Sequence, residues 1–382
     1  MPAAGSRQKL QTLARPERGA ATTLQIGFVP LIDAAPLIAA QVLGYFADEG
    51  LTVTLDRQIG WGNIRDKLTF GQLQAAHALL GMPLYSALGR EWFSEPLLAV
   101  MNLGCGADAI TFSQRLIGAG ITGANSLAAW RRRSRGDMPQ AIAHVFDCSV
   151  HHYLLRMWLA AGEVDVERDA RLCVLPPPQV ARHMAKGYLD GFCCGEPWNS
   201  LAARERTGRI VAVTSDIIPS HPDKVLAVNQ RWANAHPELV KPLVRAILRG
   251  MQFCSDAANL SRVVEVLAAP QHIGVDATVI DESLRSGSRW RGFDTANGFP
   301  SVTHHAWYAA EMTRWRHLSP DGDIPELARR CVSARAFREA AASLGIDCPD
   351  TDEPAMRLRN GFFTIESSSN AAATKCPLAA VV

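Results

Sequence analysis

The stretch LQIGFVPLIDAAPL, residues 24–37, decides the fold of this chain. Leu24 to Val29 is apolar and rich in residues that favour strands. Asp33 stands where the N-cap of a following helix is expected. From Leu37 onward apolar residues recur with a period near 3.6, and Gly50 follows as a stop signal. The stretch therefore predicts a strand followed directly by an amphipathic helix.

The same alternation of strand and helix continues along the chain. Further strands are expected at 51–55, 75–80, 142–146, 172–175, 191–194 and 225–229, and helices at 63–70, from Pro83, at 151–161 and at 178–187. Mainly helical sequence follows to about Leu344. Strands that alternate with helices are typical of βαβ units, so the rhythm predicts an α/β protein with parallel sheets.

The length of 382 residues exceeds what a single hydrophobic core normally supports, so two lobes are expected. We expect the chain to cross from one lobe to the other and back, which makes both lobes discontinuous α/β units. The predicted division is a flexible segment 1–22, lobe 1 from 23–108 and 223–366, lobe 2 from 109–222, and a flexible tail 367–382.

Composition argues against a nucleic-acid or membrane protein. The 39 basic and 37 acidic side chains leave a net charge of only +2, so no polyanion-binding surface is implied. One basic run, at Arg131, Arg132, Arg133 and Arg135, could touch RNA or an acidic partner, but a solvated helix face is the more common meaning of such a run. No apolar window approaches the roughly 20 residues that span a bilayer.

The N-terminus and the cysteines favour a cytoplasmic protein. Residues 1–23 are small and polar, without the apolar core of a secretion signal. Nine scattered cysteines form no disulfide framework, and none makes a Cys-x-x-Cys pair. We expect reduced thiols and no thiolate metal site.

Catalytic and metal-binding signatures are absent from the sequence. It contains no P-loop, no Gly-x-Ser-x-Gly, no His-Glu-x-x-His and no Gly-x-Gly-x-x-Gly. His151 and His152 are adjacent, and on a helix their side chains diverge by about 100°, which prevents them from holding one metal ion together. We therefore expect a binding protein without cofactor or metal, and not an enzyme.

Three polar or aromatic residues stand at turns where open α/β sheets bind ligands. The indole of Trp61, the imidazole of His151 and the ammonium of Lys224 could together hold one small planar anion. Each also has a simpler explanation: a tryptophan in the core, a surface histidine and a solvated lysine. Spacing alone does not decide between these interpretations.

Longer stretches show a resemblance to a known family. Besides residues 24–37, they are Trp61-Gly-Asn-Ile-Arg-Asp-Lys-Leu, Met82-Pro-Leu, Met157-Trp-Leu-Ala-Ala-Gly, Val174-Leu-Pro-Pro-Pro-Gln, Gly191-Phe-Cys-Cys-Gly-Glu-Pro-Trp-Asn and His221-Pro-Asp-Lys-Val-Leu-Ala-Val. In this order they resemble the nitrate- and bicarbonate-binding proteins of ABC importers, closely over Leu24 to Ala268 and loosely beyond. The resemblance implies a type II periplasmic-binding-protein fold with a ligand cleft between two lobes.

The resemblance also implies ligand contacts. It assigns nitrate contacts to Trp61, His151 and Lys224, and further contacts to Pro177, Gly195 and Glu196, with Gly62 beside Trp61. Asp108 stands where the family has a glutamine, and a carboxylate there would repel an anion unless it were protonated or turned away. The bicarbonate-binding branch has a glutamate in place of Lys224, so the lysine favours nitrate or nitrite.

Three functions remain open at this point. Without a visible secretion signal, the chain resembles the cytoplasmic branch of the family, which senses nitrate or nitrite and releases an RNA-binding antiterminator response regulator of the ANTAR type. The alternative is the solute-binding component of a nitrate/nitrite ABC importer. A third possibility is an enzyme of the thiamine-precursor type on the same fold, which would need a reactive thiol such as Cys193 or Cys194 in the cleft.

Overall fold

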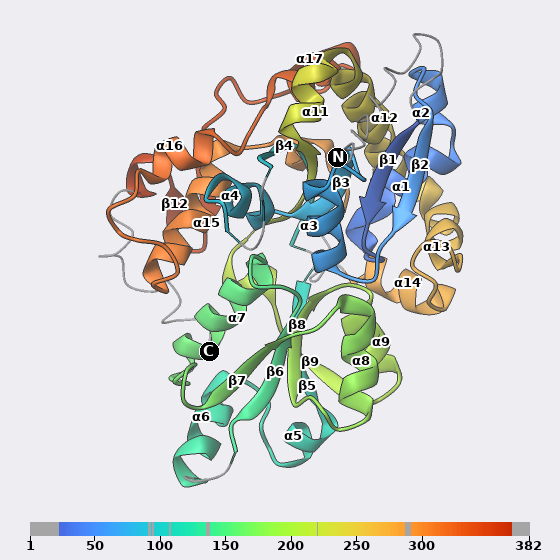
Figure 1. Ribbon diagram of the computed structural model, residues 1–382. Helices are drawn as coiled ribbons and strands as arrows, with labels where there is room; N and C mark the ends of the chain where they lie inside the picture. The colour runs from blue at the N-terminus through green and yellow to red at the C-terminus, as the bar shows by residue number, and fades with distance from the viewer. Residues whose placement is uncertain are drawn as a thin grey trace, which may run out of the picture.

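The computed structural model describes residues 23–90, 93, 95–106, 108–134, 138–219, 221–286 and 292–368. Two five-stranded sheets form two lobes, one above the other in Figure 1. The first sheet has the order β2 (Val53–Arg57), β1 (Leu24–Phe28), β3 (Ala75–Leu79), β10 (Pro222–Asn229) and β4 (Leu97–Cys105). The second has the order β7 (Ala170–Val174), β6 (Gln140–His144), β8 (Gly191–Gly195), β5 (Asp108–Ser113) and β9 (Gly208–Val213).

Both sheets are mixed, so the prediction of parallel sheets is wrong for the strands that connect the lobes. β1 runs parallel to β2 and β3, but β10 is antiparallel to β3 and β4. In the second sheet β6 runs parallel to β7 and β8, whereas β5 is antiparallel to β8 and β9. The reversed strands are β5 and β10, and each is the first strand after the chain has passed from one lobe to the other. Sequence analysis located neither β4 nor β5.

Helices cover both sheets (Figure 1). Around the first sheet they are α1 (Ala35–Val42), α2 (Tyr45–Asp48), α3 (Trp61–Thr69), α4 (Gly81–Ala87), α11 (Gln230–Ala235), α12 (Pro237–Ser255), α13 (Leu260–Ala268), α14 (Ala277–Leu284), α15 (Val302–Arg314), α16 (Ile324–Arg329) and α17 (Arg335–Ser343). Around the second they are α5 (Gln114–Gly118), α6 (Ala124–Arg133), α7 (Val150–Ala161), α8 (Pro177–Ala185), α9 (Trp198–Arg204) and α10 (Thr214–Ile217).

Short elements complete the structure. They are the 3-10 turns η1 (Ile32–Ala34), η2 (Ala257–Asn259) and η3 (Thr295–Gly298), and a hairpin of β11 (Met356–Leu358) and β12 (Gly361–Phe363). The predicted flexible segment 1–22 and all but two residues of the predicted tail lie outside the described residues. Those two, Ser367 and Ser368, close a turn on Thr364 and Ile365.

The two lobes contact each other around α7. This helix contacts α15 and β10 of the upper lobe, and α9 contacts α14 (Figure 1). A side-chain carbon on Gly81 would collide with the Cys148 carbonyl and the Tyr308 ring, and one on Gly60 would lie 3.1 Å from Pro176. The structure is therefore a closed one, in which Gly81 and Gly60 of the upper lobe leave room for the Cys148 carbonyl and for Pro176 of the lower lobe.

The sequence predicted Asp33 as a helix N-cap, and this prediction is wrong. α1 begins at Ala35 after Ala34, whose side chain makes no capping hydrogen bond, and Asp33 lies in η1. Its carboxylate contacts two residues far away in the sequence, His77 and Lys224. A local sequence pattern cannot reveal contacts with residues far away in the sequence. The N-cap interpretation explained only the position of Asp33 just before a helix.

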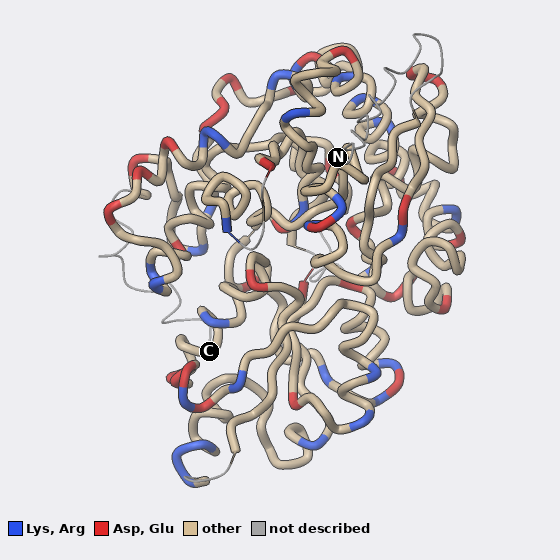
Figure 2. The backbone as a smooth tube through the Cα atoms, in the orientation of Figure 1, with Lys and Arg blue, Asp and Glu red and all other residues tan. Residues whose placement is uncertain are grey.

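Charged side chains of both signs are interspersed over both lobes (Figure 2). In the basic run of α6, Arg132 is exposed and pairs with Glu163, while Arg131 is buried and donates to the Met138 carbonyl. Arg135 lies outside the described residues. Among the described helices, none combines the length and apolarity needed to cross a bilayer.

Candidate anion-binding site

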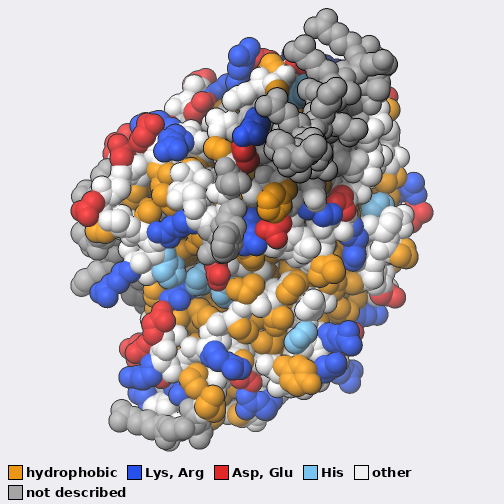
Figure 3. Space-filling view, in the orientation of Figure 1, with side chains coloured by type: hydrophobic (Ala, Val, Ile, Leu, Met, Phe, Trp, Pro, Cys, Tyr) orange, Lys and Arg blue, Asp and Glu red, His pale blue; other side chains and the backbone are white. Residues whose placement is uncertain are grey.

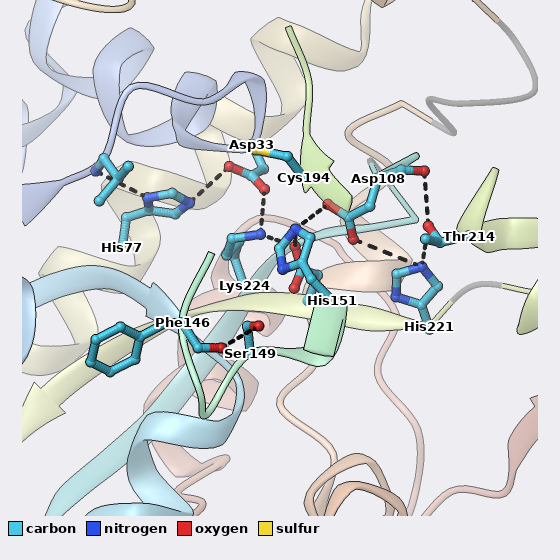
Figure 4. A network of polar contacts seen from close by, with 12 residues as sticks. Asp33, His77, Asp108, Phe146, Ser149, His151, Cys194, Thr214, His221 and Lys224 are labelled. Carbon is cyan, nitrogen blue, oxygen red and sulfur yellow. Dashed lines mark hydrogen bonds and ion pairs between the residues drawn. The ribbon is translucent and has the colours of Figure 1, made fainter. Parts of the chain in front are cut away.

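A buried polar network lies where the lobes meet (Figure 4). We call it the aspartate network; its members are Asp33, His77, Asp108, His151, His221, Asp223 and Lys224, each at most 2% exposed. They come from η1, β3, β5, α7, β10 and the segment before β10. Both lobes therefore supply groups to one cluster, and a ligand bound in it would touch both.

Lys224 is a buried cation held between two aspartates of the upper lobe. Its side chain is fully buried in β10, with the ammonium nitrogen 3.2 Å from Asp33 Oδ2 and in direct contact with the Asp223 carboxylate. The alternative of a solvated lysine is therefore wrong. Because a buried ammonium is stable only with partners, the two aspartates hold it in place.

His151 is the lower lobe's contribution to the network. It stands in the first turn of α7, which Ser149 caps by accepting from the His152 amide, and the ring is fully buried. Its Nε2 lies 2.8 Å from Asp108 Oδ1 and 3.6 Å from Asp223 Oδ2. Its Nδ1 has no hydrogen-bond partner among the described residues. The alternative of a surface histidine is wrong.

Asp33 and His77 form the upper edge of the network. The Val29 amide donates to His77 Nδ1 at 3.4 Å, so Nε2 carries the proton and donates to Asp33 Oδ1 at 2.8 Å. Burial lowers the pKa of His77, against the opposing effect of Asp33. Burial alone would raise the pKa of Asp33, but Lys224 and His77 outweigh it and hold it below its usual value. This pair is a carboxylate beside a neutral imidazole.

Asp108 and His221 form the opposite edge. Thr214 donates to the Asp108 carbonyl at 2.9 Å and lies 2.8 Å from His221 Nε2, which itself is 4.0 Å from Asp108 Oδ2. Burial lowers the pKa of His221 to about 4. Burial would raise the pKa of Asp108, but His151 and Lys224 bring it far below its usual value. Asp108 is therefore ionised inside the protein.

Trp61 lies next to the ammonium. It begins α3, its ring centroid is 5.6 Å from Lys224 Nζ, and its side chain is only 1% exposed. It also belongs to the apolar core, as the simpler explanation held. Its indole Nε1 is buried without a hydrogen-bond partner among the described residues. An unpaired buried N–H is costly, so this donor lacks an acceptor that a ligand would supply.

The other predicted contacts lie around the network. Gly62 faces Phe146 of the lower lobe, and Pro177 begins α8 next to the Pro176 that packs on Gly60. A side-chain carbon on Gly195 would lie 3.3 Å from Asp108 Oδ1, so the glycine leaves room for that carboxylate. Glu196 instead accepts from the Ser200 amide and from Ser283, which ties α9 to α14.

Sequence reasoning did not identify four members of the network: Asp33, His77, His221 and Asp223. Asp223 immediately precedes Lys224, in the His-Pro-Asp-Lys sequence that carried part of the resemblance. Asp33 lies in the stretch that decided the fold. Asp33 and Asp223 could have been noticed in the sequence, because each is an acidic residue close to the end of a strand. His77 lies inside an apolar strand, where no local pattern marks it.

A second polar cluster lies on the other side of α7. We call it the histidine cluster; it consists of His144, His152 and His317, with Asp147, Arg156 and Trp315 around them. The rings of His144 and His152 stack at 4.3 Å, and Arg156 Nε donates to His152 Nε2 at 2.7 Å. His317 bonds Tyr153 across the lobe boundary. Histidine side chains gather at this boundary in Figure 3.

Two groups of side chains have spacings that could suit a metal ion. The ligand atoms of Asp108, His151 and Asp223 lie within 4.8 Å of one another, as do those of His144, Asp147 and His152. In each group a cation of the protein already contacts these atoms: Lys224 contacts Asp223, and Arg156 contacts His152. We therefore assign no metal to either group.

The cysteines beside the network are buried thiols. Cys193 and Cys194 lie in β8 with no exposed surface. Burial raises the pKa of both thiols well above the usual value, and the charge of Asp108 raises it further. A thiol held protonated is a poor nucleophile, so the arrangement does not favour the enzyme alternative.

Comparison with known proteins identifies the family. Residues 17–268 match the NMT1-like family, and the chain belongs to it. It is 30% identical to the nitrate/nitrite binding protein NrtA of Synechococcus elongatus, over 86% of this chain and 80% of that protein. It is 34% identical to the bicarbonate transport ATP-binding protein CmpC of the same organism, over 85% of this chain. It spans only half the length of CmpC.

A solved structure confirms the fold. The periplasmic nitrate-binding protein NrtA from Synechocystis superimposes with a TM-score of 0.86, at 24% identity, over 93% of this chain and 98% of that one. The alkanesulfonate-binding protein SsuA from Xanthomonas axonopodis, bound to MOPS, superimposes with a TM-score of 0.64 at 18% identity, over 84% of this chain and all of that one. The predicted periplasmic-binding-protein fold is thus confirmed, and both of these solved structures are named as binding proteins.

Proposed function

We propose that this protein binds nitrate or nitrite between its two lobes. The observation that carries the proposal is the indole N–H of Trp61, a buried donor for which the described residues provide no acceptor, beside the ammonium of Lys224. Nitrate and nitrite are small planar anions with several acceptor oxygens, so one oxygen can accept from the indole while the charge is met by the ammonium. The 30% identity to a nitrate/nitrite binding protein supports the same ligand.

Titration calorimetry with nitrate, nitrite, bicarbonate and sulfate tests the proposal. We expect saturable binding of one nitrate or nitrite per chain and weaker or no binding of sulfate, whose second charge the network does not balance. If none of the four anions binds, or only bicarbonate does, the nitrate assignment is wrong. Thermal unfolding with and without each anion gives an independent measure, because a ligand that binds only the folded state raises Tm.

We propose further that the protein serves as the solute-binding component of an importer. This was the alternative from the sequence, and the named relatives favour it over the sensor, since they include a nitrate/nitrite binding protein and the nitrate import ATP-binding protein NrtC. The sensor role, with its cytoplasmic location and its ANTAR-type antiterminator, remains a prediction that rests on the resemblance alone.

Affinity purification from native cells separates the two roles. An importer component should co-purify with a permease and an ATP-binding subunit, and should lie outside the cytoplasmic fraction. A sensor should stay in the cytoplasmic fraction and release an antiterminator on addition of nitrate, because the coupling between ligand and partner is reciprocal. Gel filtration with the purified regulator would show the same release directly.

A further inference from the structure

The aspartate network contains more negative than positive charge. This excess opposes the binding of an anion at the proposed site. Its buried carboxylates are Asp33 and Asp223, which contact the ammonium of Lys224, and Asp108, which contacts His151, and Lys224 is the one buried ammonium among the members of the network. With neutral imidazoles the cluster is already negative before any ligand arrives. An added anion would then be buried close to uncompensated carboxylates, which is strongly unfavourable at low dielectric. Binding therefore requires a further positive charge.

His151 is the group placed to supply that charge. Its Nε2 faces Asp108 Oδ1 at 2.8 Å, and its Nδ1 has no hydrogen-bond partner among the described residues. With the proton on Nε2, the neutral ring presents a bare lone pair at Nδ1, which repels an anion. A second proton converts Nδ1 into a charged donor and leaves the Asp108 contact intact as an ion pair.

The charged and titratable groups around His151 favour an imidazolium once the anion is present. Those that act on it from neighbouring elements are Asp108 on β5, Asp223 and Lys224 on β10, Asp33 on η1, His144 on β6, and His221 before β10. Desolvation by burial lowers the pKa of His151, and Lys224 lowers it too, whereas Asp108 and Asp33 raise it. Asp223, whose Oδ2 lies 3.6 Å from Nε2, is a third carboxylate close enough to favour the protonated ring. A bound anion adds a fourth negative charge and shifts this balance toward protonation.

The other two histidines of the network are less suited. His77 uses both ring nitrogens, accepting from the Val29 amide and donating to Asp33. His221 Nδ1 also has no hydrogen-bond partner among the described residues, but its Nε2 lies against Thr214, and the ring lies on the far side of Asp108 from Lys224 in Figure 4. His151 alone of the three stands between Lys224 and Asp108 in that view.

We propose that this site takes up a monovalent oxyanion together with one proton, and that the proton resides on Nδ1 of His151. The inference rests on the proposed function and adds the regulation of the same site by pH. Nitrate and nitrite bring no proton at neutral pH and must recruit one from solvent. Bicarbonate carries its own hydroxyl proton, which can be donated to a carboxylate of the network without uptake.

Calorimetry in two cationic buffers of different ionisation enthalpy, Bis-Tris and Tris, counts the protons taken up with nitrate or nitrite. We expect about one proton per anion, and an affinity that falls roughly tenfold per pH unit between pH 7 and 8. An anion that binds with no proton uptake and with a constant Kd across this range would overturn the inference and leave the proposed function standing. Absence of any anion binding would instead overturn the proposed function.

A substitution assigns the proton to its residue. In His151→Gln the amide can still donate to Asp108, but it cannot titrate, so proton uptake should drop to zero and the residual affinity should lose its pH dependence. His152→Gln, one position along α7 and outside the network, is the matched control and should keep both. Proton uptake retained in His151→Gln, or anion binding that needs an added divalent cation and no proton, would refute the assignment.

Discussion

Two adjacent histidines of helix α7 lie in different electrostatic surroundings: carboxylates surround His151, and an arginine and further histidines surround His152. His151 enters the aspartate network, where three carboxylates surround one ammonium. His152 stacks on His144 and accepts from Arg156, with His317 nearby and the partly exposed Asp147 as the nearest carboxylate. Both rings are buried, and burial lowers the pKa of both.

The difference teaches that burial does not distinguish a ligand site from a structural cluster. What differs is the bonding of the nitrogens. In the histidine cluster His152 Nδ1 lies 3.0 Å from the Asp147 carbonyl and Nε2 accepts from Arg156, so the ring is fully paired. In the aspartate network His151 Nδ1 has no hydrogen-bond partner among the described residues. An unpaired imidazole nitrogen among buried charges indicates where a ligand belongs.

The largest effect on nitrate affinity should come from removing the ammonium of Lys224 from the aspartate network. Lys224→Gln keeps hydrogen-bond donors but removes the positive charge from among the aspartates, so nitrate affinity should fall by about a hundredfold or more. Lys241→Gln, on the partly exposed surface of α12, is the matched control and should bind like the wild type. Calorimetry measures both, and circular dichroism checks that the variant is folded. Wild-type affinity in folded Lys224→Gln would remove the main argument for the site.

Each region also holds a buried indole N–H that has no hydrogen-bond partner in the described part of the chain, which permits a matched pair of substitutions. Trp61→Phe removes the donor beside Lys224 and should weaken nitrate binding about tenfold, the value of a hydrogen bond to a charged group. Trp315→Phe removes the corresponding donor beside Arg156 and should leave Kd unchanged. Equal effects on Kd would show that the two indoles do not differ in function.

The alternation of strands and helices was predictable because it is local. Residues 24–37 contain a strand, a turn and the start of a helix, and the structure has all three. The direction of β10 was not predictable, because an isolated apolar strand gives no indication of the chain's return from another lobe. β4 was missed although it is nine residues long and nearly all buried.

The site was predictable only where the resemblance extended. Trp61, His151 and Lys224 were singled out by sequence, and the structure brings them into one cluster. Their partners Asp33 and His77 were not identified, because their roles depend on contacts between residues 44 positions apart. The charge excess of the network follows from these partners, so the requirement for a proton could not be inferred before the structure.

The histidine cluster should contribute to acid sensitivity rather than to binding. Burial lowers the pKa of His144 to about 4, against about 6.5 in the unfolded chain. The folded protein then keeps this ring neutral while the unfolded chain takes up a proton, so the free energy of unfolding falls as pH drops from 6.5 toward 4. His144→Asn keeps a donor for the Phe146 carbonyl but does not titrate.

Urea unfolding at pH 7 and pH 5 measures this contribution. The loss of stability between the two pH values should be smaller in His144→Asn than in the wild type by about 1–2 kcal/mol, since each pH unit contributes about 1.4 kcal/mol per proton. Nitrate affinity at pH 7 should not change. An identical loss in both proteins would show that His144 is not kept neutral by the fold.

The smallest effect is expected at Asp147, the carboxylate of the histidine cluster. Its side chain is 54% exposed and lies 3.9 Å from His144 Nε2, so water screens the interaction. Asp147→Asn should change the free energy of unfolding at pH 7 by no more than about 0.5 kcal/mol and leave nitrate affinity unaltered. The aspartates of the network, in contrast, are at most 2% exposed and hold Lys224. A large loss of nitrate binding in Asp147→Asn would mean that the two clusters act as one site across α7, and that the distinction between them does not hold.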